Sequence, residues 1–335
     1  MIRDALLYEK LKENSIHCYL CNHHCKIKES EFGFCGVRKN SEGNLYTHAY
    51  GEVAVAKSDP VEKKPLYHFL PGTMTFSIGT PGCNFHCGFC QNWKISQVSF
   101  SQTEIRSKTL LPQNVLSMAI REKCKSISYT YTEPTIFFEY ALDTSRLAKE
   151  MGLYNIFVTN GFMTSEALKM ISPYLDACNV DLKSFSENFY SKTCQGHLKP
   201  VLRSIEEMKK LGIWLEITTL VIPDQNDSEK ELSEIAEFIA GLDKNIPWHI
   251  SRFHPDYEFM DRISTPLETI DRACAAGKTA GLKYIYKGNI LGDVTETQCA
   301  KCGITLIRRT GFFVDMNIVE DAACPSCGEP VAGFF

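Results

Sequence analysis

The chain has 335 residues, 44% of them hydrophobic, which is enough for one large core with smaller attached modules. Its net charge of −4 and pI near 6.2 argue against a generally basic surface for nucleic acid or anionic membranes. No apolar run reaches the roughly 18 residues of a membrane span. The charged start MIRDALLYEKLKENS predicts a helix rather than a signal peptide, so we expect a cytoplasmic protein.

Strand-like and helical patterns alternate through the middle of the chain. Repeated strand–helix units with apolar strands predict a parallel sheet covered by helices. Because six or seven units fall short of the eight of a closed barrel, we expect an α/β fold, a partial (β/α)6 open TIM-like barrel. A doubly wound sheet is the alternative. The predicted strands are 73–78, 126–131, 155–159, 177–182, 213–222, 248–253 and 283–288, and the predicted helices are 112–124, 134–152, 198–212, 228–242 and about 266–280.

The fifteen cysteines divide the chain into three parts. Without a secretory signal, clustered cysteines favour metal binding over disulfides. We expect an N-terminal cysteine-rich segment (1–72), a central barrel (73–290) and a C-terminal zinc-ribbon-like module (291–335). The clusters are Cys18, Cys21, Cys25 and Cys35; Cys83, Cys87 and Cys90; and Cys299, Cys302, Cys324 and Cys327. The scattered Cys124, Cys178, Cys194 and Cys274 are predicted to be small buried hydrophobes.

The two outer quartets predict closed metal sites. The C-terminal cysteines form two C-x2-C-G motifs around an alternating stretch with Gly311 near its middle, which is typical of a zinc ribbon. An iron site or a further Fe–S cluster is the alternative there. The N-terminal spacing, C-x2-C-x3-C-x9-C, suits zinc and an Fe–S cluster equally well. Nearby His17, His23 and His24 could replace a cysteine, although solvated surface histidines are the simpler interpretation.

The central stretch GTPGCNFHCGFCQNW has only three cysteines, Cys83, Cys87 and Cys90, spaced C-x3-C-x2-C. Three thiolates do not fill a tetrahedral metal site. They can hold three irons of a [4Fe–4S] cluster and leave the fourth iron open for a chelating ligand. A zinc site completed by a remote ligand such as His86 is the alternative, but structural zinc usually uses paired C-x2-C motifs.

Unusual polar residues follow the predicted strands. In parallel α/β folds the chemistry lies at the carboxyl ends of the strands, so these residues should share one rim with the three cysteines. Each has a simple structural explanation alone, as a turn residue, a helix-start acid or a solvated charge. They are Glu133 in YTEPT, Thr159 and Asn160 in TNGF, Asp181 and Lys183 in DLK, Asn226 in PDQND and His254 in FHPD.

The motif CNFHCGFC, with Phe89 before the third cysteine, resembles the C-x3-C-x-aromatic-C signature of the radical SAM superfamily. The resemblance implies that S-adenosylmethionine (SAM) chelates the open iron through its amino and carboxylate groups. An electron from the cluster, supplied by a donor such as flavodoxin or ferredoxin, then cleaves SAM to methionine and a 5′-deoxyadenosyl radical. This radical abstracts hydrogen from a substrate.

Residues 73–260 are similar to the pyruvate formate-lyase activating enzyme group, through YTEP, TNGF, DLK and VIPDQND. That similarity implies catalytic roles for Lys183, Asp181 and Glu133, with Lys183 pairing with the SAM carboxylate. Tyr131-Thr132 stands where the group usually has Gly-Gly, and Val158 stands where it has an aspartate beside a monovalent cation. The implied cofactor-binding residues are Phe89, Thr132, Glu133, Thr159, Asn160, Asp181, Lys183, Asn226 and His254.

The stretches FCGVRKN and DPVEKKPLYHFLPG extend the similarity to the radical SAM component of the AmmeMemoRadiSam system. This implies Memo-like and AMMECR-like protein partners. We expect an activating-enzyme-like oxidoreductase that acts on a protein or peptide, by glycyl-radical activation for example. A small-molecule or RNA-base substrate is the alternative, and a zinc-rich scaffold without catalysis is a third. Only Arg308-Arg309 forms a basic pair in the C-terminal module, which disfavours nucleic acid as partner.

Overall fold

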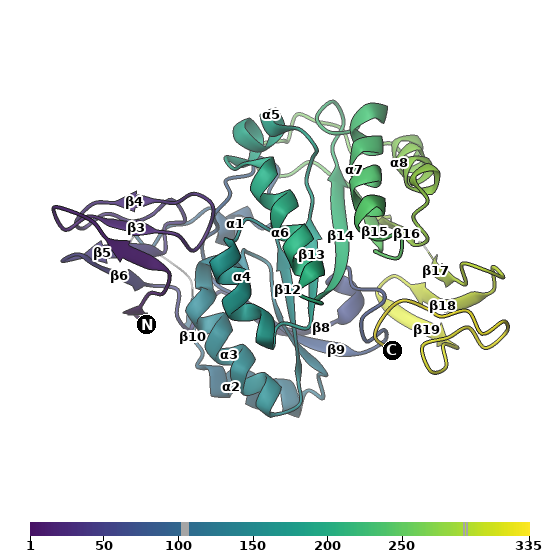
Figure 1. The fold of residues 1–335 in the computed structure, drawn as a ribbon, viewed down its shortest axis with the longest axis horizontal. Coiled ribbons are helices and arrows are strands. Elements are labelled where there is room, and N and C mark those ends of the chain that lie inside the picture. The colour runs from purple at the N-terminus through teal and green to yellow at the C-terminus, as the bar shows by residue number, and fades with distance from the viewer. Residues whose placement is uncertain (102–106, 291, 293) are drawn as a thin grey trace.

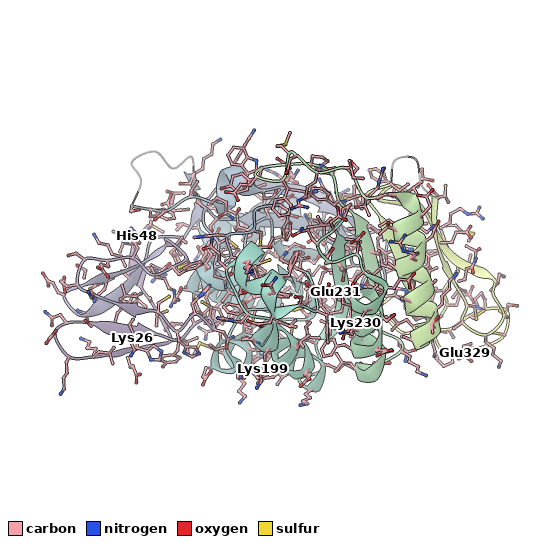
Figure 2. All side chains as sticks on the ribbon, turned by 90° about the horizontal axis from the view of Figure 1, so that it is seen from above. Lys26, His48, Lys199, Lys230, Glu231 and Glu329 are labelled. Atoms are coloured by element: carbon pink, nitrogen blue, oxygen red, sulfur yellow. The ribbon has the colours of Figure 1, made fainter. Side chains whose placement is uncertain are left out.

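The computed structural model describes residues 1–101, 107–290, 292 and 294–335. The chain has three regions in a row, with the N-terminal segment and the C-terminal strands at opposite ends of a central layer of helices and sheet (Figure 1). Seen from above, Lys26 and His48 lie at one end and Glu329 at the other (Figure 2). The predicted boundary between barrel and C-terminal module falls at residue 291, which lies outside the described residues.

The central sheet has eight strands in the order β16-β15-β14-β13-β12-β11-β9-β8. Seven of them are parallel and follow one another in chain order, so the sheet has no switch point and the doubly wound alternative is wrong. The α/β class is confirmed, in the form of a mixed sheet. The parallel strands are β9 (Met74–Gly79), β11 (Ser126–Tyr129), β12 (Tyr154–Thr159), β13 (Ala177–Asp181), β14 (Trp214–Val221), β15 (Trp248–Arg252) and β16 (Ile285–Gly288).

The eighth strand, β8 (Val55–Pro60), pairs antiparallel with β9 and was not predicted. Its sequence VAKSDP shows no apolar run, because an edge strand exposes part of its side chains. The turn that follows leads into the sheet's amino-terminal edge, where Glu216 accepts hydrogen bonds from the backbone N–H groups of Tyr67 (3.0 Å) and His68 (2.8 Å). His249 also pairs with Glu216 at 2.7 Å. These contacts close the bottom of the sheet.

Helices connect the parallel strands and begin at ordinary capping signals. Thr164 accepts from the Ala167 N–H at the start of α4, and Ser228 from the Glu231 N–H at the start of α7. The predicted helix at 134–152 begins as a 3₁₀ turn and then continues as α3. The main helices are α2 (Pro112–Arg121), α3 (Phe138–Glu150), α4 (Ser165–Ile171), α6 (Leu198–Lys210), α7 (Glu229–Leu242) and α8 (Leu267–Ala280). Among the described residues, no helix is both long and apolar enough to cross a membrane.

The predicted N-terminal helix is wrong. Its residues form β1 (Arg3–Asp4), paired with β6 (Asn44–Thr47), and β2 (Tyr8–Lys10), paired with β3 (Ile16–Cys18). Leu7 between them has φ of 58°, which no α-helix contains. Tertiary strand pairing overrides a weak helical propensity here. Two further strands, β4 (Lys26–Ile27) and β5 (Arg38–Ser41), complete two small sheets around the N-terminal cysteines.

The C-terminal module is a three-stranded sheet of β17 (Val294–Gln298), β18 (Thr305–Thr310) and β19 (Phe313–Asn317). The predicted hairpin is confirmed, with Gly311 at φ of 60° in its turn, whereas β17 was not predicted. Arg309 is fully buried and donates to the Tyr67 carbonyl (2.6 Å) and Thr297 Oγ1 (2.9 Å). This guanidinium fastens the module to the amino-terminal edge of the central sheet.

Candidate active site

The loop after β9 places three cysteine side chains, Cys83, Cys87 and Cys90, on the wall of a cavity of about 430 Å³. The cavity opens at the carboxyl edge of the parallel strands, as predicted. Backbone turns fold the loop tightly: the Phe85 N–H donates to Cys83 Sγ (3.4 Å) and the Cys90 N–H to the Cys87 carbonyl (3.1 Å). Phe89, between two of the cysteines, is 4% exposed and also lines the cavity.

The arrangement of these thiols and the position of His86 bear on the two metal hypotheses. Among the described residues, they do not form a group whose ligand atoms all lie within 4.8 Å of one another. Thiolates that bind different irons of a cube lie farther apart than sulfurs that share one zinc ion. His86 does not line the cavity and stacks on Phe34 at 4.4 Å instead. The residues therefore fit an Fe–S cluster with one open iron better than a zinc site completed by His86.

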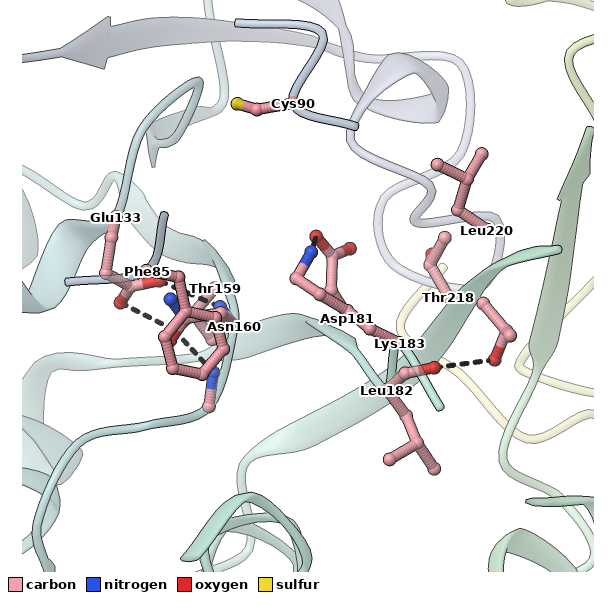
Figure 3. A network of polar contacts seen from close by, with 12 residues as sticks. Phe85, Cys90, Glu133, Thr159, Asn160, Asp181, Leu182, Lys183, Thr218 and Leu220 are labelled. Atoms are coloured by element: carbon pink, nitrogen blue, oxygen red, sulfur yellow. Dashed lines mark hydrogen bonds and ion pairs between the residues drawn. The ribbon is translucent and has the colours of Figure 1, made fainter. Parts of the chain in front are cut away.

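Glu133 is the buried carboxyl group of the site, with 1% of its surface exposed. Its Oε1 accepts from Thr135 Oγ1 (2.5 Å) and the Thr135 N–H (3.0 Å). Oε1 also accepts from Thr159 Oγ1 (2.8 Å), and Oε2 accepts from the Asn160 N–H (2.8 Å) (Figure 3). Burial raises the pKa of this carboxyl, while the four donors lower it. Glu133 therefore ties the ends of β11 and β12 together beside the cavity.

Asn160 links the loop after β12 to the cysteine loop. Its Nδ2 donates to Asn84 Oδ1 at 2.7 Å, and its Oδ1 accepts the Phe162 N–H at 3.0 Å. Gly161, at φ of 70°, supplies the left-handed turn that this arrangement needs. Asn84 lies directly after Cys83 and was not singled out in the sequence, because an asparagine between cysteines carries no pattern of its own.

Asp181 and Lys183 form an ion pair across the cavity from Glu133, with Oδ2 and Nζ 2.8 Å apart (Figure 3). The Lys183 side chain is only 14% exposed. Burial lowers its pKa, but Asp181 and the nearby Cys87 and Cys194 side chains outweigh burial and hold the pKa well above its ordinary value. The site therefore presents a fixed positive charge near the cysteine loop.

Seven of the nine predicted cofactor-binding residues line the cavity, and Asn226 and His254 do not. Asn226 is fully buried, and its side-chain amide donates to the Lys183 carbonyl (2.6 Å) and accepts from the Ile222 N–H (2.6 Å). These bonds join the backbone that follows β13 to the backbone that follows β14. His254 is exposed and contacts the Gln91 side chain at 2.9 Å. The lining residues among the nine are Phe89, Thr132, Glu133, Thr159, Asn160, Asp181 and Lys183.

Other cavity residues were missed. Lys64 is 2% exposed and pairs with Asp59 (2.8 Å), which also accepts from the Tyr131 hydroxyl. Tyr131 adopts φ of 68°, an unusual conformation for tyrosine, at the position where the activating-enzyme pattern has glycine. Phe312 reaches the cavity from the tip of the C-terminal hairpin. These contacts join segments that are distant in the sequence, so no local sequence pattern predicts them.

The C-terminal cysteines form a compact quartet. Cys299 Sγ lies 3.6 Å from Cys327 Sγ, and Cys302 Sγ lies 3.7 Å from Cys324 Sγ. All four sulfurs lie within 4.8 Å of one another. Four thiolates at Zn–S distances of about 2.3 Å are separated by about 3.8 Å in a tetrahedron. The quartet can hold one metal ion.

The scattered cysteines are buried as predicted. Cys194 has a neighbour that the sequence did not suggest, since its side chain hydrogen-bonds with that of Cys87. Cys178 lies in β13, Cys124 follows α2 and Cys274 lies in α8.

The fold and site together define an α/β enzyme with a cysteine loop at the carboxyl edge of its strands. Residues 77–239 match the radical SAM superfamily. An uncharacterized protein of Methanocaldococcus jannaschii is 44% identical over 335 residues, which cover 98% of this chain and 99% of that protein. GTP 3′,8-cyclase of Helicobacter pylori is 34% identical over 263 residues, 72% of this chain and 79% of the cyclase.

A further M. jannaschii protein, provisionally named a glycyl-radical enzyme activating enzyme, is 27% identical over 212 residues, 62% of this chain and 76% of its own. The chain belongs to the radical SAM superfamily and is an enzyme of that type. The last relative supports its predicted place near the pyruvate formate-lyase activating enzyme group.

Proposed function

We propose that the chain cleaves SAM reductively and uses the resulting 5′-deoxyadenosyl radical to abstract hydrogen from a protein or peptide. The observation that carries the proposal is the single cavity that collects Cys83, Cys87 and Cys90 with Glu133 and the Asp181–Lys183 pair. A [4Fe–4S] cluster on the three thiolates would supply the electron that breaks the sulfonium C–S bond.

The surrounding side chains would hold the two ends of the SAM amino acid. Lys183 offers a fixed ammonium to the carboxylate, and Asp181, at 2.8 Å, orients that ammonium. Within the described part of the chain, Glu133 Oε2 accepts a single hydrogen bond, from the Asn160 N–H, so it keeps an acceptor position for the ammonium of SAM. Phe89, Thr132, Thr159 and Asn160 line the same cavity and would exclude water from it.

The protein-substrate proposal rests on the relative named as an activating enzyme. An external flavodoxin or ferredoxin is the proposed reductant, and Memo-like and AMMECR-like proteins are the proposed first partners to test. A small-molecule substrate is the second candidate. It is favoured by the relative named GTP 3′,8-cyclase, which is 34% identical to this chain, against 27% for the relative named as an activating enzyme.

The outer regions would be structural or accessory. We assign zinc to the C-terminal quartet, because its sulfur separations of 3.6 and 3.7 Å match a tetrahedral site with no open position. The division into residues 1–72, 73–290 and 291–335 is part of the same proposal. Phe312, at the hairpin tip, would contact a substrate that enters the cavity.

The test uses anaerobically reconstituted protein with SAM and dithionite, and measures 5′-deoxyadenosine by mass spectrometry. Extract from cells grown in deuterated medium is then split by ultrafiltration and added. If the retentate labels 5′-deoxyadenosine with deuterium and protease treatment of the retentate removes that labelling, the substrate is a protein. If the filtrate labels 5′-deoxyadenosine with deuterium, the substrate is a small molecule. A Cys83→Ala/Cys87→Ala/Cys90→Ala variant should form no 5′-deoxyadenosine, with Cys124→Ala as control. Unchanged turnover in the triple variant would refute the proposed site.

A further inference from the structure

The N-terminal cysteines form one site. Cys18 ends β3, Cys21 and Cys25 lie in the turn to β4, and Cys35 lies before β5. The Cys18 N–H donates to the Cys25 carbonyl at 2.9 Å. A Cβ added at Gly33, two residues before Cys35, would lie 3.8 Å from Cys25 Sγ, and the Arg38 guanidinium reaches Cys18 Sγ at 3.5 Å. The strands and turns that carry the four cysteines are therefore neighbours.

The separation of these sulfurs distinguishes the site from the C-terminal quartet. The C-terminal sulfurs all lie within 4.8 Å of one another, but the N-terminal ones do not form such a group, and neither do those of Cys83, Cys87 and Cys90. One shared ion draws four sulfurs to about 3.8 Å, whereas each thiolate of a cube binds its own iron and lies farther from the others. In this respect the N-terminal quartet resembles the three cysteines of the cavity and differs from the C-terminal quartet.

A buried cation accompanies the quartet. Arg38 is 1% exposed and donates to Cys18 Sγ at 3.5 Å and to the Leu6 carbonyl at 2.8 Å, and it pairs with the buried Glu139. A cluster bound by four thiolates carries net negative charge, and hydrogen bonds to its sulfurs tune its potential. Arg38 offers a donor to Cys18 Sγ, while Glu139 balances its charge.

The quartet also lies against the catalytic loop. His23 Nε2 is 2.7 Å from the Asn84 carbonyl, and Phe34 stacks on His86 at 4.4 Å. A methyl group at Gly82, directly before Cys83, would lie only 3.1 Å from the Cys35 carbonyl. The backbones that carry the two sets of cysteines are therefore in contact. Cys21, Cys25 and Cys35 are partly exposed, which leaves the outer side accessible to a donor protein.

We propose that Cys18, Cys21, Cys25 and Cys35 hold a second [4Fe–4S] cluster that passes electrons to the catalytic site. The relay role rests on the function proposed above. In each transfer an external one-electron donor of the flavodoxin or ferredoxin class loses one electron, which the N-terminal cluster accepts. That cluster is reoxidised when the cluster on Cys83, Cys87 and Cys90 accepts the same electron. No proton or atom moves in this step.

The first test counts metals in the anaerobically reconstituted full chain. We expect about eight irons and about one zinc per chain, with the zinc in the C-terminal quartet. The Cys83→Ala/Cys87→Ala/Cys90→Ala variant should keep about four irons and an EPR signal that does not change when SAM is added. A Cys124→Ala/Cys274→Ala variant, which removes two cysteines outside the clusters, should keep the wild-type iron content. About four irons with two zinc ions in the wild type would overturn the second cluster.

The second test addresses the relay. A Cys18→Ser/Cys21→Ser/Cys25→Ser/Cys35→Ser variant should show a ratio of flavodoxin-driven to dithionite-driven 5′-deoxyadenosine formation that is several-fold below the wild-type ratio. An unchanged ratio would overturn the relay. Because this variant could misfold, the fully reduced wild type provides an independent readout: two neighbouring reduced clusters should give a broadened, spin-coupled EPR spectrum. A spectrum equal to the sum of two isolated clusters would contradict the proposed contact. Iron retained in the triple variant but no SAM response in the wild type would instead refute the proposed catalytic cluster.

Discussion

Replacing Lys183 with methionine keeps the length of the side chain and removes its charge. Lys183 is 14% exposed and makes one ion pair, with Asp181 at 2.8 Å, so the change should leave the cysteine loop and its cluster intact. A charge-assisted hydrogen bond to the SAM carboxylate contributes about 1.5–3 kcal/mol, and its loss should weaken SAM binding by roughly ten- to a hundredfold. Asp181, left without its cation, would repel the same carboxylate and push the loss toward the upper value.

The assay is anaerobic calorimetry of SAM binding to reconstituted protein, with iron content measured in parallel. Lys192→Met, an exposed lysine in the following turn, is the matched control. A Lys183→Met/Asp181→Asn double variant should regain part of the affinity, because the unpaired carboxylate is gone. SAM affinity within about twofold of wild type in Lys183→Met would refute the assigned contact.

Three further changes test other parts of the structure. Glu133→Gln places an amide donor opposite the buried Asn160 N–H and should cost about 2–3 kcal/mol, seen as a lower thermal midpoint; an unchanged midpoint would contradict this. Cys302→Ser should make the C-terminal module protease-sensitive while SAM cleavage remains measurable, and retained trypsin resistance with lost cleavage would overturn the structural-zinc assignment. Burial lowers the pKa of His68 to about 4, so the unfolded chain binds more protons between about pH 6.5 and 4, and stability should fall as pH falls through this window. The thermal midpoint of His68→Gln should therefore depend less on pH over that range than the wild-type midpoint does. The midpoint of the exposed control His254→Gln should keep the wild-type pH dependence.

The sequence was sufficient for those parts of the fold that depend on local pattern. Apolar strands followed by capped helices predicted seven parallel strands, and the structure places all seven in chain order. Residues that follow strand ends, such as Glu133 and Lys183, were predicted to meet because parallel strands end at one edge. The two C-x2-C-G motifs predicted the C-terminal quartet, because this short spacing places both cysteines of a motif on one tight turn.

Features that depend on distant contacts were not predictable. The start of the chain looks helical, yet β1 is fixed by the distant β6, where Thr47 lies opposite Arg3, and β2 by β3. Asn226 sits in a motif that suggested a ligand contact, and only the structure shows its amide spent on the Lys183 carbonyl. The Asp59–Lys64–Tyr131 network joins three segments, none of which is unusual alone.

We propose that Cys83, Cys87 and Cys90 hold a cluster with an open iron that binds SAM. The most direct measurement is the EPR spectrum of the anaerobically reconstituted, dithionite-reduced protein with and without SAM. We expect a [4Fe–4S] signal whose g values shift on addition of SAM, and whose SAM-dependent shift disappears in the Cys83→Ala/Cys87→Ala/Cys90→Ala variant. A reduced-cluster spectrum that SAM leaves unchanged in the wild type would rule out SAM binding at an open iron of this cluster.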